Sequence, residues 1–224
     1  MGADAPVRGF ADRTLADIAT ALPGATALFR QHKLDFCCGG NVPLREAAAV
    51  RALDVPALEA ALDEVAARAT PVATPADTDA LIGLIETTYH AGHRAALPEL
   101  QRLARRVEAV HKANPAVPAG LADLLAAMGE DLEAHMRKEE QVLFPLMRAG
   151  GHPMIGHPIA MMLAEHDDHG AHLRALEALT QDFTPPEGAC TTWRALYAGL
   201  AQFTDALMAH IHLENAVLFP RFTG

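Results

Sequence analysis

Apolar residues from about residue 78 onward recur at the three- to four-residue spacing of amphipathic helices. The first such stripe carries Leu81, Ile85, Tyr89 and Leu97, and its segment ends near His111. Further long helices are predicted over 119–148, 159–181 and from a cap at Thr191 or Thr192, with turns at 114–118, 150–158 and 185–188. Four long helices with short connections predict an antiparallel up-down-up-down bundle.

The N-terminal part of the chain predicts several shorter helices. Thr14 is a plausible N-cap, Pro23-Gly24 ends the first helix, and Leu58 and Leu62 share an apolar stripe further on. The predicted organisation is all-α, with a small helical cysteine-bearing domain at 1–70, a linker at 71–77 and the bundle at 78–224. The linker is predicted because prolines interrupt any helix there.

An eleven-residue motif, His135–Pro145, returns as His210–Pro220 with six identical positions and no gap. Each copy places a glutamate, Glu139 or Glu214, four residues after the histidine. In a helix these side chains differ by about 40° and lie one turn apart, so they point the same way. The repeated pairing of imidazole with carboxylate predicts two transition-metal ions held symmetrically.

A second repeat lies upstream, where His90-x-x-His93 and His166-x-x-His169 are separated by 76 residues. The duplicated unit is therefore a helix pair, in which one helix carries a single histidine and the next carries His-x-x-x-Glu. Each bundle helix then contributes one histidine to a metal site in the core. The predicted metal ligands are His90, His135, Glu139, His166, His210 and Glu214.

This ligand set leaves room for chemistry at the metals. If both carboxylates bridge two six-coordinate ions, the protein fills about eight of twelve positions, and an oxo or hydroxo bridge takes two more. Two ferric ions with only two carboxylates favour such a bridge electrostatically. About one open position per metal would admit a small ligand such as O2 or NO.

Two further acids are candidates for roles beside the metals. Asp131 lies one turn before His135, which suggests support of a ligand or a proton relay, with an exposed acid as the alternative. Glu165 precedes His166 and could orient a ligand, border a channel or be exposed. His93 and His169 lie about 60° from the ligand stripe, so they are expected near the ligands or at the surface.

Cys37 and Cys38 admit two interpretations. Adjacent thiols are expected to diverge, which disfavours a separate metal site, but the following Gly-Gly and helix start could lower a thiol pKa for a redox or metal-transfer role. The alternative is a pair of small buried residues in a turn. Cys190 is interpreted as structural.

The net charge of the chain and the sequence patterns that it lacks argue against several classes of partner and location. A net charge of −10 and a pI near 5.6 argue against nucleic acid or an anionic membrane as the main partner. The absence of a long apolar run, of a secretory signal pattern and of a disulfide framework favours the cytoplasm.

The sequence resembles the bacterial iron-sulfur cluster repair proteins, the repair-of-iron-centres family, over nearly its whole length. Residues 22–30 and 35–40 resemble that family's short cysteine-bearing domain, and the motifs at 89–90, 135–140, 165–167 and 210–215 resemble its hemerythrin-like bundle. The resemblance implies two iron ions per chain, held by the six ligands already identified. It also implies repair of iron-sulfur clusters damaged by nitrosative or oxidative stress, by donating iron or by processing NO.

Other functions remain open at this point. One is a hemerythrin-like carrier or sensor of O2 or NO, although such carriers generally use a fifth histidine for which no clear candidate lies on the ligand stripe. Another is a di-iron NO reductase. The expected partners are damaged iron-sulfur proteins and small ligands, without nucleic acid or membrane, and a homodimer is left open.

Overall fold

The computed structural model describes residues 9–68 and 75–223, which divide into two compact units. The first unit contains the described residues before 75 together with 211–221, and the second contains most of the remainder. Within the predicted linker at 71–77, residues 71–74 lie outside the described part of the chain. Both units are helical, which confirms the all-α class, and none of the described helices is long and apolar enough to cross a membrane.

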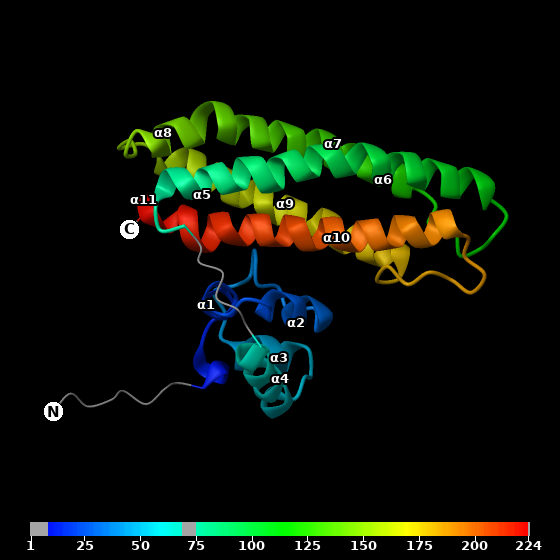
Figure 1. Cartoon of the computed structure of the whole chain (residues 1–224), viewed down its shortest axis with the longest axis horizontal. Coiled ribbons are helices and arrows are strands. Elements are labelled where there is room, and N and C mark those ends of the chain that lie inside the picture. The colour runs from blue at the N-terminus through cyan, green and yellow to red at the C-terminus, as the bar shows by residue number, and fades with distance from the viewer. Residues whose placement is uncertain (1–8, 69–74, 224) are drawn as a thin grey trace. The chain divides into compact units, whose positions relative to one another are not determined.

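The first unit is built from short helices (Figure 1), and its buried residues form a small apolar core. Its elements are a 3₁₀ turn at Phe10–Asp12, α1 (Leu15–Ala21), α2 (Ala25–Gln31), α3 (Leu44–Val50) and α4 (Val55–Arg68). The predicted cap at Thr14 is confirmed, because its side chain accepts a hydrogen bond from the Asp17 amide. Ile18, Phe29 and Leu62 are fully buried in the core.

The loop between α2 and α3 is held by contacts within this unit. Asn215 Nδ2 donates to the Cys37 carbonyl at 2.8 Å, and His212 packs edge-on against Phe36 with ring centroids 5.6 Å apart. Gly40 lies so close to the loop backbone that an added Cβ would stand 2.3 Å from the Phe36 carbonyl oxygen. Only glycine fits at residue 40 without moving the backbone.

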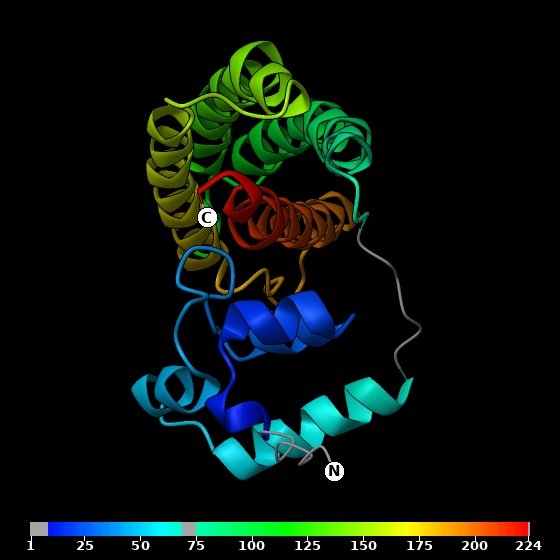
Figure 2. The ribbon, with the colours of Figure 1, turned by 90° about the vertical axis from the view of Figure 1, so that its left-hand side faces the viewer.

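The chain from α5 onward forms the predicted four-helix bundle, and residues 211–221, at the C-terminal end of its last long helix, also belong to the first unit. The elements of the bundle are α5 (Thr78–Leu84), α6 (Ala91–Val110), α7 (Leu121–Lys138), α8 (Phe144–Arg148), α9 (Gly156–Thr180), α10 (Thr191–Leu213) and α11 (Pro220–Thr223). The colours in Figure 1 run in opposite directions along successive long helices, and Figure 2 looks along the bundle. α6 packs on α7, and α7 packs on α9. Trp193, Leu196 and Leu200 are fully buried on α10.

Three π-helical turns interrupt the bundle helices, at Ile85–His90, Glu139–Leu143 and Glu214–Leu218. In the last two, the amide of the phenylalanine at 144 or 219 donates to the carbonyl of the glutamate five residues earlier. Pro145 and Pro220 follow directly. A proline cannot donate to the carbonyl four residues back and its ring clashes with that carbonyl, so a wider turn relieves the conflict.

Three helix starts in the bundle differ from the prediction, and the first is that of α7, which begins at Leu121 instead of Ala119. α9 begins at Gly156 instead of Ile159, because Pro158 falls in the first turn, where a missing amide proton breaks no helical hydrogen bond. At the start of α10, the carbonyl of Cys190 accepts the first helical hydrogen bond, from the Arg194 amide at 3.0 Å. The capping position is therefore Cys190, and Thr191 already belongs to the helix.

We expect Gly40→Ala to destabilise the first unit by about 1–3 kcal/mol, because its methyl group would collide with the Phe36 carbonyl. Gly39→Ala is the matched control, since its methyl group would meet its nearest neighbour at 3.4 Å. Hydrogen exchange of the α1–α3 peptides measures the difference. Equal protection in the two variants would contradict the close approach at Gly40.

Candidate metal centre

The six predicted metal ligands converge in the interior of the bundle. His90 ends one π turn, Glu139 and Glu214 begin the other two, and the remaining histidines come from α7, α9 and α10. Every one of the six side chains is at most 1% exposed. Duplicated motifs far apart in the sequence therefore meet at one buried point.

The donor atoms form two sets that share both carboxylates. One set contains His90 and His210, the other contains His135 and His166, and each includes Glu139 and Glu214. In each set the donor atoms lie within 4.8 Å of one another. The Nε2 atoms of each histidine pair face each other at 3.2 Å, and Glu139 Oε2 is 3.4 Å from Nε2 of both His90 and His135. Glu139 thus occupies a bridging position between the two sets.

The chemistry of this donor set fits metal cations. Imidazole nitrogens and carboxylate oxygens are the ligands preferred by first-row transition metals. Burying two carboxylates is costly unless cations or hydrogen bonds compensate their charge. Metal cations held by these sets would neutralise the shared glutamates and accept the converging nitrogen lone pairs.

The outer nitrogens of two histidines contact carboxylates from other helices. His90 Nδ1 lies 2.7 Å from Glu140 Oε1, and His135 Nδ1 lies 2.9 Å from Glu165 Oε2. Such contacts fix the tautomer that leaves Nε2 unprotonated and so able to bind a metal. Glu165 therefore lies where it can orient a ligand, although that ligand is His135 and not its sequence neighbour His166.

The two carboxylates that contact these outer nitrogens, Glu140 and Glu165 (the outer carboxylates), form ion pairs with basic side chains. Arg94 donates to Glu140 and to Glu133, while Lys138 pairs with Glu165. Burial opposes ionisation of Glu140, but its hydrogen bonds with Arg94 and His90 outweigh this effect and lower the pKa of Glu140. Glu140 is therefore a carboxylate at neutral pH.

Aromatic rings pack against the histidines on both sides. Tyr89 stacks on His210 with an interplanar angle of 11°, and Phe144 stacks on His90 at 20°. His93 lies 5.3 Å from the His210 ring, and His169 meets the His135 ring edge-on. His93 and His169 are therefore buried beside the ligands, and their predicted alternative place at the surface is wrong.

Asp131 lies outside this buried cluster. Its side chain is 62% exposed, and its carboxylate is 3.9 Å from His172 Nε2. The His172 ring is 6.5 Å from that of His169, which contacts His135. The structure thus places Asp131 at the solvent end of a line of histidines, and any relay role for it stays a prediction.

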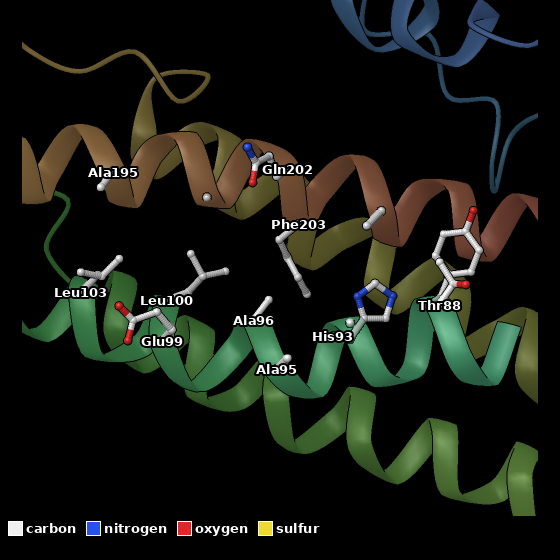
Figure 3. A pocket seen from close by; sticks show the side chains of 14 residues that line it. Thr88, His93, Ala95, Ala96, Glu99, Leu100, Leu103, Ala195, Gln202 and Phe203 are labelled. Carbon is white, nitrogen blue, oxygen red and sulfur yellow. The ribbon is translucent and has the colours of Figure 1, made fainter. Parts of the chain in front are cut away.

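An apolar pocket of about 510 Å³ lies between α6 and α10 (Figure 3). His93 and Leu100 on one side face Phe203 on the other. Tyr89 also lines the pocket, and both Tyr89 and His93 pack on His210. The pocket therefore reaches the residues in contact with one predicted metal ligand.

The cysteine pair differs from the sequence-based expectations in two respects, although Cys37 is buried in a loop as the alternative interpretation expects. The Cys37 and Cys38 sulfurs lie 3.7 Å apart and gather with Asp35 Oδ1, so the expected divergence of their side chains is wrong. The neighbouring Cys38, burial and Asp35 together raise the pKa of the Cys37 thiol far above its ordinary value. Cys37 is therefore a protonated thiol at neutral pH, contrary to the expected lowering. Asp35, Cys37 and Cys38 together could hold a metal ion.

Glu140 lies inside the motif at 135–140 but is not among the predicted site residues. It follows Glu139 directly, as Glu165 directly precedes His166, so an acid adjacent to a ligand is the signal that both share. The second repeat has Asn215 at the position of Glu140, which hides the pattern. The contact partners could not be predicted, because each acid supports a histidine on a different helix.

Comparison with known proteins agrees with this architecture. Residues 85–222 match the hemerythrin HHE cation binding domain, and residues 11–66 match a domain of unknown function (DUF542). The chain is 47% identical to the iron-sulfur cluster repair protein YtfE of Dickeya chrysanthemi (strain Ech1591), over 95% of this chain and 97% of that protein. It is 48% identical to the protein of the same name from Yersinia pseudotuberculosis serotype IB (strain PB1/+), with the same coverage. For the Edwardsiella ictaluri (strain 93-146) protein the identity is 46%, over 96% and 98% of the two chains.

We expect Glu140→Gln and Glu165→Gln each to weaken metal binding by about 10–100-fold, because an amide orients the histidine less firmly and carries no charge. Glu86→Gln is the matched control, since Glu86 is similarly exposed and pairs with Arg148 away from the histidines. Competition with a chelator measures the affinity. Unchanged affinity in both variants would show that the outer contacts do not tune the ligands.

Proposed function

Because the chain belongs to the family of iron-sulfur cluster repair proteins, we propose that it restores damaged iron-sulfur clusters through a di-iron centre in its bundle. The single observation that carries the proposal is the pair of buried His/Glu sets that share Glu139 and Glu214. Two metals close enough to share carboxylates can act together on one small ligand. His90 and His210 would hold one iron, and His135 and His166 the other.

Iron suits this centre better than zinc. Zinc prefers four-coordinate sites with three or four protein ligands, whereas shared carboxylates favour six-coordinate ions with room for an oxygen bridge. We propose an oxo or hydroxo bridge, because two carboxylates neutralise only part of the charge of two ferric ions. When bound, such a centre supplies open positions for NO or O2.

Two ways of repairing a cluster are compatible with this centre. In the first, the protein donates iron to a damaged cluster; in the second, it removes NO from the cluster's surroundings. The carrier or sensor function and the NO reductase function use the same metals and are the alternatives to repair. Damaged iron-sulfur proteins as clients, a homodimer and a cytoplasmic location stay predictions from the sequence.

We expect the double variant Glu139→Ala, Glu214→Ala to lose both irons while its helices remain formed, because it removes both shared carboxylates. The native protein should contain two irons per chain, with the Mössbauer and visible signature of an oxygen bridge. It should also restore activity to a purified iron-sulfur hydratase inactivated with NO, and the double variant should not.

The alternatives give different results in the same assays. Reversible O2 binding without recovery of the hydratase would favour a carrier, and sustained conversion of NO to N2O with an electron donor would favour a reductase. Zinc in place of iron in protein from iron-supplied cells would overturn the di-iron proposal.

We expect Gly92→Leu to slow the binding of NO to the reduced centre several-fold without changing its iron content. Gly92 lines the apolar pocket beside His93, and a Cβ added there meets no atom within 4 Å, so the leucine can extend into the cavity. Gly83→Leu is the matched control, because it is equally unhindered on α5 but does not line that pocket. Stopped-flow mixing with NO measures the rate, and equal rates in both variants would exclude the pocket as the approach path.

A further inference from the structure

Cys190 forms a close pair with a histidine at the start of α10. The His111 Nε2 atom lies 3.2 Å from the Cys190 sulfur, although the two residues are 79 positions apart in the sequence. The pair joins the C-cap of α6, which is His111, to the capping residue of α10, which is Cys190. A thiol within hydrogen-bond reach of an imidazole is the arrangement of a nucleophile with its base.

The surroundings keep the pair in place and leave it accessible. The His111 ring packs on the fully buried Trp193 with centroids 5.0 Å apart, which restricts its rotation. Both members of the pair are half-buried and line a cavity of about 360 Å³ with Thr191 and Thr192. This volume is sufficient for a small organic molecule to approach the sulfur.

The charges at this cavity are positive. Arg106 on α6 lines it, and Arg194 donates from its Nε to the carbonyl of Ala189, next to Cys190. Cys190 also stands at the N-terminal end of a helix of 23 residues, whose unpaired amides carry partial positive charge. An anionic reagent is attracted by such a field.

We propose that Cys190 is a nucleophilic thiol that undergoes thiol–disulfide exchange with small disulfides carrying carboxylate groups, with His111 as its base. The Cys190 sulfur attacks one sulfur of the disulfide, so that a new S–S bond forms and the original S–S bond breaks. The proton of Cys190 passes to His111 Nε2 and then to the departing thiolate. Cys190 is oxidised to a mixed disulfide, and half of the reagent is reduced to a thiol.

This site is separate from the proposed metal centre. Along α10, the 20 residues from Cys190 to His210 rise by about 30 Å. Cys190 cannot therefore act as a metal ligand or meet a molecule bound at the metals. It also differs from Cys37, whose thiol is held protonated by its neighbours. On this proposal Cys190, which the sequence analysis interprets as structural, is a modification site.

The test uses the full-length iron-loaded protein and two disulfides of similar size, the dianion 3,3′-dithiodipropionate and the dication cystamine. Mass spectrometry of the Cys190 peptide follows the reaction at this residue without substitution of the other cysteines. We expect the native chain to react with the dianion about tenfold or more faster than free cysteine at pH 7. His111→Ala should reduce that rate by about tenfold or more, and added imidazole should restore part of it by occupying the space of the lost ring.

Two controls separate this chemistry from a change in packing. Arg106→Gln should lower the rate with the dianion and leave or raise the rate with cystamine, which a general loosening of the fold would not do. Iron content and circular dichroism report whether each variant is folded. A native rate no higher than that of free cysteine would overturn the proposal, as would a folded His111→Ala protein that reacts at the native rate.

Discussion

The burial of two carboxylates among four imidazoles is the constraint on which the rest of the bundle depends. Glu139 and Glu214 are fully buried, and each takes part in both ligand sets. An isolated charge at that depth would be expelled or neutralised. The bundle must therefore bring the histidines of four helices to the same level, and small errors in helix length or rotation would leave a carboxylate without its partners.

The π turns adjust the helices so that the histidines and glutamates can lie at the same level of the bundle. Each of the two glutamates begins a π turn that ends before a phenylalanine and a proline. The wider turn changes the direction of its last residue and of the phenylalanine that follows, and Leu143, Phe144, Leu218 and Phe219 are all buried in the core. Irregular helix geometry is concentrated at the ligands, as is common for π-bulges at functional sites.

The carboxylates of Glu140 and Glu165 couple the packing of the helices to the orientation of the histidines. Glu140 and Glu165 each contact a histidine on another helix and are themselves paired with Arg94 or Lys138. A shift of one helix would therefore disturb the hydrogen bond that sets the tautomer of a ligand on its neighbour. The two thiols also have different surroundings, since Cys38 and Asp35 raise the pKa of Cys37, whereas the Cys190 sulfur contacts the Nε2 atom of His111 on another helix.

The sequence alone determined the helical class, the bundle and the six His and Glu residues that the structure gathers in one buried cluster. It could do so because apolar periodicity and His-x-x-x-Glu spacing are local properties that repeat in each half of the chain. The tertiary structure decided which atoms meet across helices: Glu140 with His90, Glu165 with His135, and His111 with Cys190. It also brought the sulfurs of Cys37 and Cys38 together and left Asp131 exposed. These contacts depend on the rotation and packing of whole helices, which no short sequence motif specifies.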